Sequence, residues 1–408
     1  MPDFKREKFV CCVLGLGYIG LPTAALIAKT KNKVIGVDIN KKVVDLVNNG
    51  KIHIIENGLE DLVKDVVNAG FLVAQTKPSK ADIFLLAVPT PLEINEDGIP
   101  KPNIDFVLKA ARSITKFIEP GNLVILESTS PVGTTEKIAE LLSKESGIPI
   151  SQISIAYCPE RVLPGNALKE IIFNNRVIGG LNKYSANKGE NFYKLFCEAE
   201  FIKTNARTAE LVKLAENASR DVNIAFANEL SIISEELGIN HREVIDIANK
   251  HPRVQILKPG CGVGGHCIAI DPWFIASQCP ENSKLIQTAR NVNKYKTLWS
   301  IKLIRNHIKN LEINLCRKAK VGIFGLTFKE DIDDIRESPA LFITEELIKE
   351  GHDLIVCEPN ISKLSKIRLS SFEETISKSD ILVFLVAHYQ FKNSDFKNKE
   401  IIDLCGVL

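Results

Sequence analysis

The residues best suited to do chemistry lie in the segment Gly264-Gly265-His266-Cys267, which Asp271 follows four residues later. Small residues around Cys267 permit an exposed turn and let a substrate approach the backbone closely. Removing one hydride from an alcohol needs no thiol, so a thiol in such a turn indicates oxidation beyond the aldehyde through a covalent intermediate. The alternative interpretation is a structural cysteine, because free cysteines are among the most buried residues.

A second set of polar residues, Lys213, Asn217 and Arg220, has the i, i+4, i+7 spacing that places all three along one stripe of a helix. A free cysteine has a pKa of about 8.5 and needs a nearby cation or donor to supply thiolate. Lys213 is the candidate cation, and Asp271 could orient its ammonium group or a water. A solvated stripe is the usual meaning of this spacing, but the neighbouring apolar residues favour a buried helix: Leu211, Leu214, Ala215, Ala218 and Val222.

A dinucleotide signature stands near the N-terminus, where Gly15-Leu16-Gly17-Tyr18-Ile19-Gly20 lies between an expected strand at 10–14 and an expected helix at 21–30. Asp38 follows about 20 residues on, where a carboxylate binds ribose hydroxyls and repels a 2′-phosphate, so NAD is favoured over NADP. Thr90 and Thr129 follow two later strands and belong to the same sheet edge. The alternative is a glycine turn kept for packing.

The elements that position these residues follow from the hydrophobic pattern. Short β-type runs at 9–14, 33–37, 82–87, 122–126 and 153–156 alternate with amphipathic stretches, which predicts a parallel sheet with helices on both faces. Residues 208–237 contain neither glycine nor proline and predict a long helix that ends at Gly238. The alternation of strands and helices returns at 321–325, 353–357, 381–386 and 401–404.

We therefore expect an α/β fold with two doubly wound, Rossmann-like parallel-sheet lobes joined by a long central helix. The expected domains are a sheet lobe at 1–200, a helical spine with the cysteine loop at 201–310, and a second sheet lobe at 311–408. The spine has more apolar surface than one thin lobe can cover. Pairing two spines about a two-fold axis would bury that surface, so a homodimer is expected.

The composition excludes several classes of protein. A net charge of +2 with 45% hydrophobic residues gives no basic field for nucleic acid. The uncharged stretch 9–28 is long enough to mimic a membrane span, but its glycines and Pro22 argue against one, so no membrane partner is expected. The ten cysteines contain no Cys-x-x-Cys pair, which favours a reducing, cytoplasmic compartment. His266 beside Cys267 lacks further ligands at zinc spacing, so we expect no metal.

At these residues the chain resembles the UDP-glucose/GDP-mannose dehydrogenase family over essentially its whole length. Besides the fingerprint, Lys213 with Asn217 and the cysteine segment, the matching motifs are Pro-Glu-Arg-Val-Leu-Pro-Gly at 159–165 and Gly-Leu-Thr-Phe-Lys at 325–329, followed by Asp334, Arg336, Glu337 and Ser338. Within the family, Arg161, His266 and the His251-Pro252-Arg253 segment are most similar to the branch that oxidises UDP-N-acetyl-D-mannosamine.

The resemblance implies roles for individual residues. It implies NAD binding in 1–200 and UDP-sugar binding in 311–408, with Arg336 reaching NAD from the second lobe. The NAD residues would be Gly15, Gly17, Tyr18, Ile19, Gly20, Asp38, Thr90, Thr129 and Arg336. The substrate residues would be Arg161, Val162, Lys213, Asn217, Arg220, His251, Arg253, Gly264, Phe328 and Lys329. The catalytic residues would be Cys267, Lys213, Asn217, Asp271, Glu160 and Thr129.

The chain departs from the family's pattern in two places. Leu163-Pro164 stand where UDP-glucose enzymes place a glutamate that orders water, and Cys405 stands where relatives usually carry a basic residue. Several functions therefore stay open beside four-electron oxidation of UDP-N-acetyl-D-mannosamine. They are a UDP-N-acetylglucosamine or UDP-glucose 6-dehydrogenase, a two-electron hydroxy-acid dehydrogenase, and a non-catalytic nucleotide-sugar scaffold.

Overall fold

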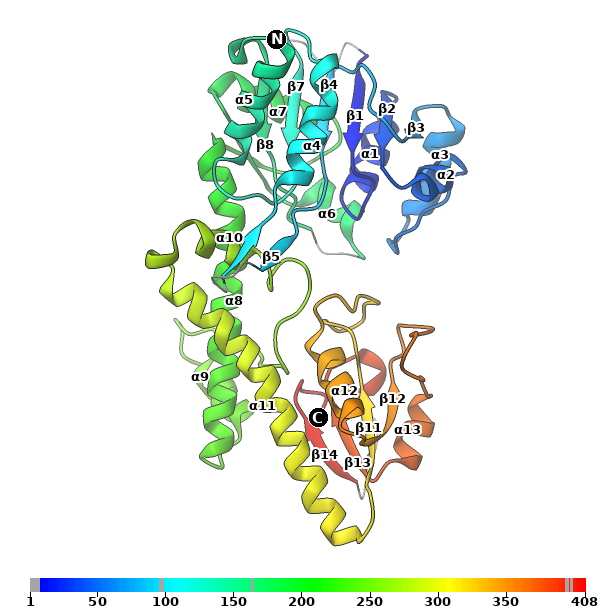
Figure 1. Cartoon of the computed structure of the whole chain (residues 1–408), viewed down its shortest axis with the longest axis vertical. Helices are drawn as coiled ribbons and strands as arrows, with labels where there is room; N and C mark the ends of the chain where they lie inside the picture. The colour runs from blue at the N-terminus through cyan, green and yellow to red at the C-terminus, as the bar shows by residue number, and fades with distance from the viewer. Residues whose placement is uncertain (1–7, 95–98, 163–164, 393–395, 397–398) are drawn as a thin grey trace. The chain divides into compact units, whose positions relative to one another are not determined.

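The computed structural model describes residues 8–94, 99–162, 165–392, 396 and 399–408. Its internal contacts divide the chain into two compact units, Met1–Ala215 and Glu216–Leu408. The long helix α8 (Ala206–Glu236) contains the boundary between them. Each unit contains a parallel-sheet lobe, as the sequence predicted (Figure 1). The three expected domain ranges stay predictions, because a division into two units does not decide among them.

The sheet of the first unit has the strand order β10-β9-β8-β7-β4-β1-β2-β3. All pairs are parallel except β8–β9, which is antiparallel. The predicted runs fall on these strands within one or two residues at each end. The strands are β1 (Val10–Leu14), β2 (Lys33–Val37), β3 (Leu72–Gln75), β4 (Ile83–Leu86), β7 (Leu123–Leu126), β8 (Ser154–Tyr157), β9 (Arg176–Gly180) and β10 (Phe201–Asn205). A separate antiparallel pair joins β5 (Leu92–Ile94) to β6 (Pro100–Pro102).

Helices cover both faces of this sheet because side chains alternate along each strand. On β1, Cys11 and Val13 enter one hydrophobic cluster with helices α1, α3 and α7, whereas Cys12 and Leu14 enter another with α4 and α5. The helices are α1 (Gly20–Lys29), α2 (Lys41–Asn48), α3 (Leu59–Asn68), α4 (Asp105–Ile114), α5 (Thr134–Ser146), α6 (Ala167–Phe173) and α7 (Lys183–Tyr193). Short 3₁₀ turns follow α4 and α5 at Thr115–Phe117 and Ile150–Gln152.

The second unit contains a smaller sheet of order β12-β11-β13-β14, and each pair is parallel. Its strands are β11 (Lys320–Phe324), β12 (Asp353–Cys357), β13 (Ile381–Phe384) and β14 (Glu400–Asp403), close to the ranges expected from the sequence. One face packs on α11 (Lys284–Leu315) and α12 (Pro339–Lys349). The other carries an aromatic cluster near α13 (Phe372–Lys378), in which Phe324 and Phe384 stack at 4.6 Å.

Helices α8 and α11 are joined inside the second unit by buried polar contacts. Arg290 forms an ion pair with Asp221 at 2.6 Å. The side-chain amide of Asn293 donates to Asp221, and its side-chain oxygen accepts a hydrogen bond from Asn228. Helix α8 ends at Glu236, and Gly238 follows with a φ of 66°, so the predicted glycine stop is confirmed. The remaining elements are α9 (His241–Ala248), α10 (Asp271–Gln278) and 3₁₀ turns at Pro280–Asn282 and Tyr389–Phe391.

Residues 9–28, which mimic a membrane span in sequence, form β1, the glycine turn and most of α1. Within the described part of the chain, no helix combines the length and the apolar character needed to cross a membrane.

Candidate active site

The glycine turn after β1 has the geometry that a bound pyrophosphate requires. Gly15 has a φ of 94°, and a Cβ at this position would lie 2.4 Å from the carbonyl oxygen of Ala87, so only glycine fits. A Cβ added at Gly17 would meet nothing within 4 Å among the described residues. The second glycine therefore leaves open space at the N-terminus of α1, where backbone amides and the helix dipole favour phosphate.

Asp38 lies just after β2 and is held beside this turn. One carboxylate oxygen accepts from the backbone N–H of Leu16 at 3.1 Å and the other from that of Asn40 at 2.8 Å. The side chain is only half-buried. Its remaining acceptor capacity suits the hydroxyls of an adenosine ribose, so the turn and its acid fit NAD.

Two strand ends lie near this turn on the same edge of the sheet. The hydroxyl of Thr90 is buried and has no hydrogen-bond partner among the described residues. An unsatisfied buried hydroxyl is costly, which points to a ligand partner for it. Ser128 donates to the carbonyl of Val88 at 2.6 Å and joins the two strand ends, and Thr129 follows half-buried.

Lys213 and Glu160 are brought together in the first unit. Lys213 is 5% exposed, and its Nζ donates to the carbonyl of Glu160 at 2.8 Å and lies 3.5 Å from the Glu160 carboxylate. The other oxygen of Glu160 accepts from the backbone N–H of Val162 at 2.8 Å. Arg161 donates to the carbonyl of Asn175 at 2.9 Å. These contacts fix the 160–162 segment beside the lysine; Leu163 and Pro164 lie outside the described residues.

Cys267, Asp271 and Asn217 form a second group, in the second unit. The backbone N–H groups of Ile270 and Asp271 donate to the carbonyl of Cys267 at 3.0 and 2.8 Å, so the cysteine closes a turn directly before α10. Asp271 is 3% exposed and accepts a 2.6 Å hydrogen bond from Asn217 Nδ2. Cys267 itself is half-buried. The expectation that Asp271 orients Lys213 or a water stays a prediction, and the structure adds Asn217 as a partner of this carboxylate.

The glycines before Cys267 lie against the 328–337 segment. A Cβ on Gly265 would lie 2.8 Å from the ring of Phe328, and Gly265 N donates to the carbonyl of Arg336 at 3.0 Å. The Arg336 guanidinium binds Asp334, with its closest contact at 2.6 Å. Burial opposes ionisation of Asp334, but these hydrogen bonds outweigh burial and lower its pKa. The cysteine loop and the expected UDP-binding segment therefore form one packed body.

Other expected substrate residues lie at the surface of their own unit. Arg220, His251, Arg253 and Lys329 are exposed, and Arg253 N donates to the His251 ring at 3.3 Å. Cys405 lies half-buried with its thiol 3.6 Å from Asp403 Oδ1. Among the described residues, no group of three His, Cys, Asp or Glu side chains is placed to hold a metal.

Sequence reasoning missed a buried network behind the 325–329 segment. Glu358 follows β12 and accepts from the backbone N–H groups of Leu326 and Thr327 at 2.7 and 3.3 Å. His388, fully buried, lies with its Nε2 3.1 Å from the same carboxylate. His388 Nδ1 lies 2.9 Å from the backbone N–H of Asp331, so both ring nitrogens have partners in this network. The position of Glu358, directly after the second strand of its lobe like Asp38, was the available signal.

Comparison with known proteins shows the family. The NAD binding domain of the UDP-glucose/GDP-mannose dehydrogenase family matches residues 9–197, its central domain 207–295 and its UDP binding domain 322–408. The chain belongs to the UDP-glucose/GDP-mannose dehydrogenase family, whose members are NAD-dependent nucleotide-sugar dehydrogenases.

Individual relatives cover almost the whole chain. A UDP-N-acetyl-D-mannosamine dehydrogenase of Campylobacter jejuni is 48% identical over 97% of this chain and 98% of its own length. An NDP-N-acetyl-D-galactosaminuronic acid dehydrogenase of Ralstonia nicotianae is 45% identical over 97% of this chain and 95% of its own. The solved UDP-N-acetyl-mannosamine dehydrogenase of Staphylococcus aureus has a TM-score of 0.87 and 41% identity over 98% of this chain and 95% of its own.

Proposed function

We propose that the chain is a UDP-N-acetyl-D-mannosamine 6-dehydrogenase. It would oxidise the C6 hydroxyl to the carboxylate of UDP-N-acetyl-D-mannosaminuronate with two NAD, for surface polysaccharide biosynthesis. The names of the relatives support the sugar, and the NAD and UDP binding domains support the two ligands. The observation that carries the four-electron reaction is the half-buried thiol of Cys267. The carbonyl of Cys267 accepts from the backbone N–H of Asp271, and the carboxylate of Asp271 accepts a hydrogen bond from Asn217.

The first oxidation would use residues of the first unit. A water or base held near Thr129, Glu160 and Lys213 would take the proton of the C6 hydroxyl, and the contacts of Lys213 Nζ with Glu160 hold these two side chains together for that step. NAD, when bound on the Gly15–Gly20 turn, accepts a hydride in each of the two oxidations. The product of this stage is the C6 aldehyde.

The second oxidation would pass through Cys267. The thiol gives its proton to water as its sulfur forms a bond to the aldehyde carbon, and the carbonyl π electrons move to oxygen to give a thiohemiacetal oxyanion that Asn217 and Lys213 can stabilise. Loss of hydride from that carbon gives a thioester. A water oriented by Asp271 or Glu160 adds to the thioester carbon, the carbon–sulfur bond breaks, and the carboxylate leaves with the thiol restored.

Replacement of Cys267 by serine tests this proposal. The unmutated enzyme should form two NADH per UDP-N-acetyl-D-mannosamine, whereas Cys267→Ser should stop after the first oxidation and give no uronate. Cys279→Ser, an exposed cysteine just after α10, is the matched control and should keep both oxidations. NADH is followed by absorbance and uronate by mass spectrometry. Undiminished uronate formation by Cys267→Ser would refute covalent catalysis.

The sugar preference needs a separate experiment, because the Ralstonia nicotianae relative is named for a galactosaminuronic acid. UDP-N-acetyl-D-mannosamine, UDP-N-acetylglucosamine and UDP-glucose offered to the purified chain should give the highest kcat/KM with the first. A higher value with either of the others would replace the substrate in the proposal and leave the thiol chemistry intact. A count of one NADH per sugar would instead favour a two-electron dehydrogenase.

A homodimer in a cytoplasmic compartment belongs to the same proposal. Phe226 and Ile233 on α8 are exposed by 54% and 46%, and Leu237, directly after the helix, is exposed by 65%. Their spacing of seven and four residues places them along one stripe, which a second copy could cover. Sedimentation of the purified chain should give twice the monomer mass, and a monomer at micromolar concentration would contradict the pairing.

A further inference from the structure

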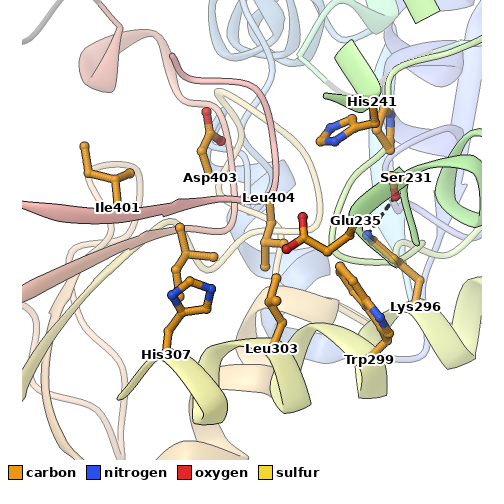
Figure 2. A pocket seen from close by; sticks show the side chains of 12 residues that line it. Ser231, Glu235, His241, Lys296, Trp299, Leu303, His307, Ile401, Asp403 and Leu404 are labelled. Atoms are coloured by element: carbon orange, nitrogen blue, oxygen red, sulfur yellow. Dashed lines mark hydrogen bonds between the residues drawn. The ribbon is translucent and has the colours of Figure 1, made fainter. Parts of the chain in front are cut away.

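A cavity of about 200 Å³ lies in the second unit (Figure 2). Its walls come from α8, α9, α11, β14 and the turn before Gly260. The residues that matter for its chemistry are Ser231, His241, Lys296, Trp299, Leu303 and Asp403. None of them is among the residues assigned above to NAD or to the sugar nucleotide.

Lys296 is the unusual member of this lining. The residue is 3% exposed, and its Nζ donates to Ser231 Oγ at 2.8 Å and lies 3.9 Å from the centre of the Trp299 ring. Among the described residues, Lys296 makes no ion pair with a carboxylate within 4.0 Å. Buried charges in proteins are normally paired, so this ammonium group lacks a counter-ion where it lines a cavity.

The other charged groups of the lining do not supply the missing partner. Asp403 is bound by Arg242 at 2.7 Å and accepts from the backbone N–H groups of Cys405, Gly406 and Leu408, so its oxygens are occupied. His307 lies 2.8 Å from Glu400. Glu235 is exposed, and water screens its charge.

The pKa values of two cavity residues, Lys296 and His241, are consistent with this lack of a counter-ion. Burial lowers the pKa of Lys296 to about 8, against the opposing effects of Cys261 and Glu235. Burial also lowers the pKa of His241, and the charges of Arg242 and Lys296 lower it further. The surroundings of the cavity therefore lower the pKa values of both Lys296 and His241, and a bound anion would raise them.

We propose that this cavity binds a small organic anion whose carboxylate or phosphate group pairs with Lys296 and whose carbon skeleton lies along Trp299 and Leu303. Pro259, in the stretch that leads to the cysteine segment, also lines the cavity. The next residue, Gly260, donates its N–H to Asn228 Oδ1 at 2.9 Å, one turn of α8 before Ser231. A bound anion would join α8, α11 and this segment at one point.

The fluorescence of Trp299 can test the proposal in the full chain. The sequence has two tryptophans, so Trp273→Phe leaves Trp299 as the one emitter. Titration with succinate and with glycerol phosphate, at constant ionic strength set with chloride, should give a saturable change in emission for at least one probe. The probe that saturates distinguishes a carboxylate head group from a phosphate.

Two variants in the same background decide the outcome. Lys296→Met should lose the response, and Lys302→Met, an exposed lysine on the same helix, should keep it. Circular dichroism checks that both fold. In the unmutated chain, the saturating probe should also slow acylation of Lys296 by acetic anhydride, read by mass spectrometry, and leave Lys302 unchanged. No saturation with either probe, an unaltered response in Lys296→Met, or unprotected Lys296 would overturn the proposal.

Discussion

The two sheet lobes begin with the same turn and use it differently. After its first strand, each lobe has a glycine, Gly15 or Gly325, whose N–H donates to the last residue of the neighbouring strand at 2.8 or 2.9 Å. In each, the next residue, a leucine, donates its backbone N–H to an acid at the end of the second strand. The acid is Asp38 in the first lobe and Glu358 in the second.

The lobes differ in what surrounds that acid. In the first, the half-buried Asp38 and the empty space over Gly17 leave room for ribose and phosphate. In the second, Thr327 takes the place of Gly17, and buried His388 lies against Glu358. The same backbone turn therefore leaves room for a ligand in the first lobe. In the second lobe, side chains of the protein fill the corresponding place, and we call the contacts of Glu358 with His388, Leu326 and Thr327 the clamp.

The largest effect is expected at Glu358. Glu358→Leu would leave His388 and two backbone N–H groups without their buried acceptor. A buried group left without its hydrogen-bond partner costs about 1–3 kcal/mol, and three groups lose theirs here, so the free energy of unfolding in urea should fall by about 3 kcal/mol or more. Glu373→Leu, an exposed glutamate in the same lobe, should change it by less than about 0.5 kcal/mol. A loss below about 1 kcal/mol at Glu358 would contradict the clamp.

A methyl group at Gly17 should damage binding without damaging the fold. Gly17→Ala adds a Cβ that meets no protein atom within 4 Å but stands where pyrophosphate approaches. We expect the KM for NAD to rise about 30-fold, or about 2 kcal/mol, with the unfolding midpoint unchanged. Thr327→Ala in the second lobe should leave the KM for NAD unaltered. Equal effects of the two substitutions on that KM would remove the distinction between the lobes.

Asp38→Asn should mainly change the choice of cofactor. The carboxylate that bonds ribose and repels a 2′-phosphate becomes neutral, so the ratio of kcat/KM for NAD to that for NADP should fall about 10-fold, or about 1.4 kcal/mol. Steady-state kinetics with both cofactors measures this ratio. Asp61→Asn, an exposed aspartate on α3, serves as the control. An unchanged ratio would show that Asp38 only supports the turn.

The smallest effect is a pH dependence of stability in the second lobe. Burial opposes ionisation of Glu358, but hydrogen bonds from His388 and from backbone N–H groups outweigh burial and lower its pKa. The unfolded chain then binds more protons, so this contribution is complete above the ordinary glutamate pKa of about 4.3 and is lost as pH falls through the lower folded value. The stability difference between the unmutated chain and Glu358→Gln should shrink below about pH 4. A constant difference from pH 7 to pH 3 would argue against an ionised clamp.

Much of the fold could be predicted because local signals and packing agree. The run 33–37 is β2 and 353–357 is β12, residue for residue, and the glycine-free stretch 208–237 is α8 within two residues. The antiparallel pairing of β9 with β8 could not be predicted, because the residues of Arg176–Gly180 do not indicate the direction of the neighbouring strand. Pairing direction is set by long-range topology and leaves no mark in a five-residue pattern.

The candidate site was recoverable where a motif fixes its own geometry. The glycine turn with Asp38, and Cys267 with Asp271 four residues on, are local arrangements, and the structure has both. The bond from Asn217 to Asp271 and the clamp from His388 to Glu358 join residues far apart in sequence. Nothing in either segment alone indicates its partner, so these contacts required the tertiary structure.

The close approach of Gly265 to the Phe328 ring matters for anyone who redesigns the sugar pocket. Gly265 and the Phe328 ring pack so closely that a side chain at position 265 would clash with the ring. A cysteine loop transplanted from a relative with another sugar preference would therefore have to pack against a ring positioned for a different loop. Under the proposed function, a change of sugar preference should therefore require exchanging both segments together, beginning with the contact between Gly265 and Phe328.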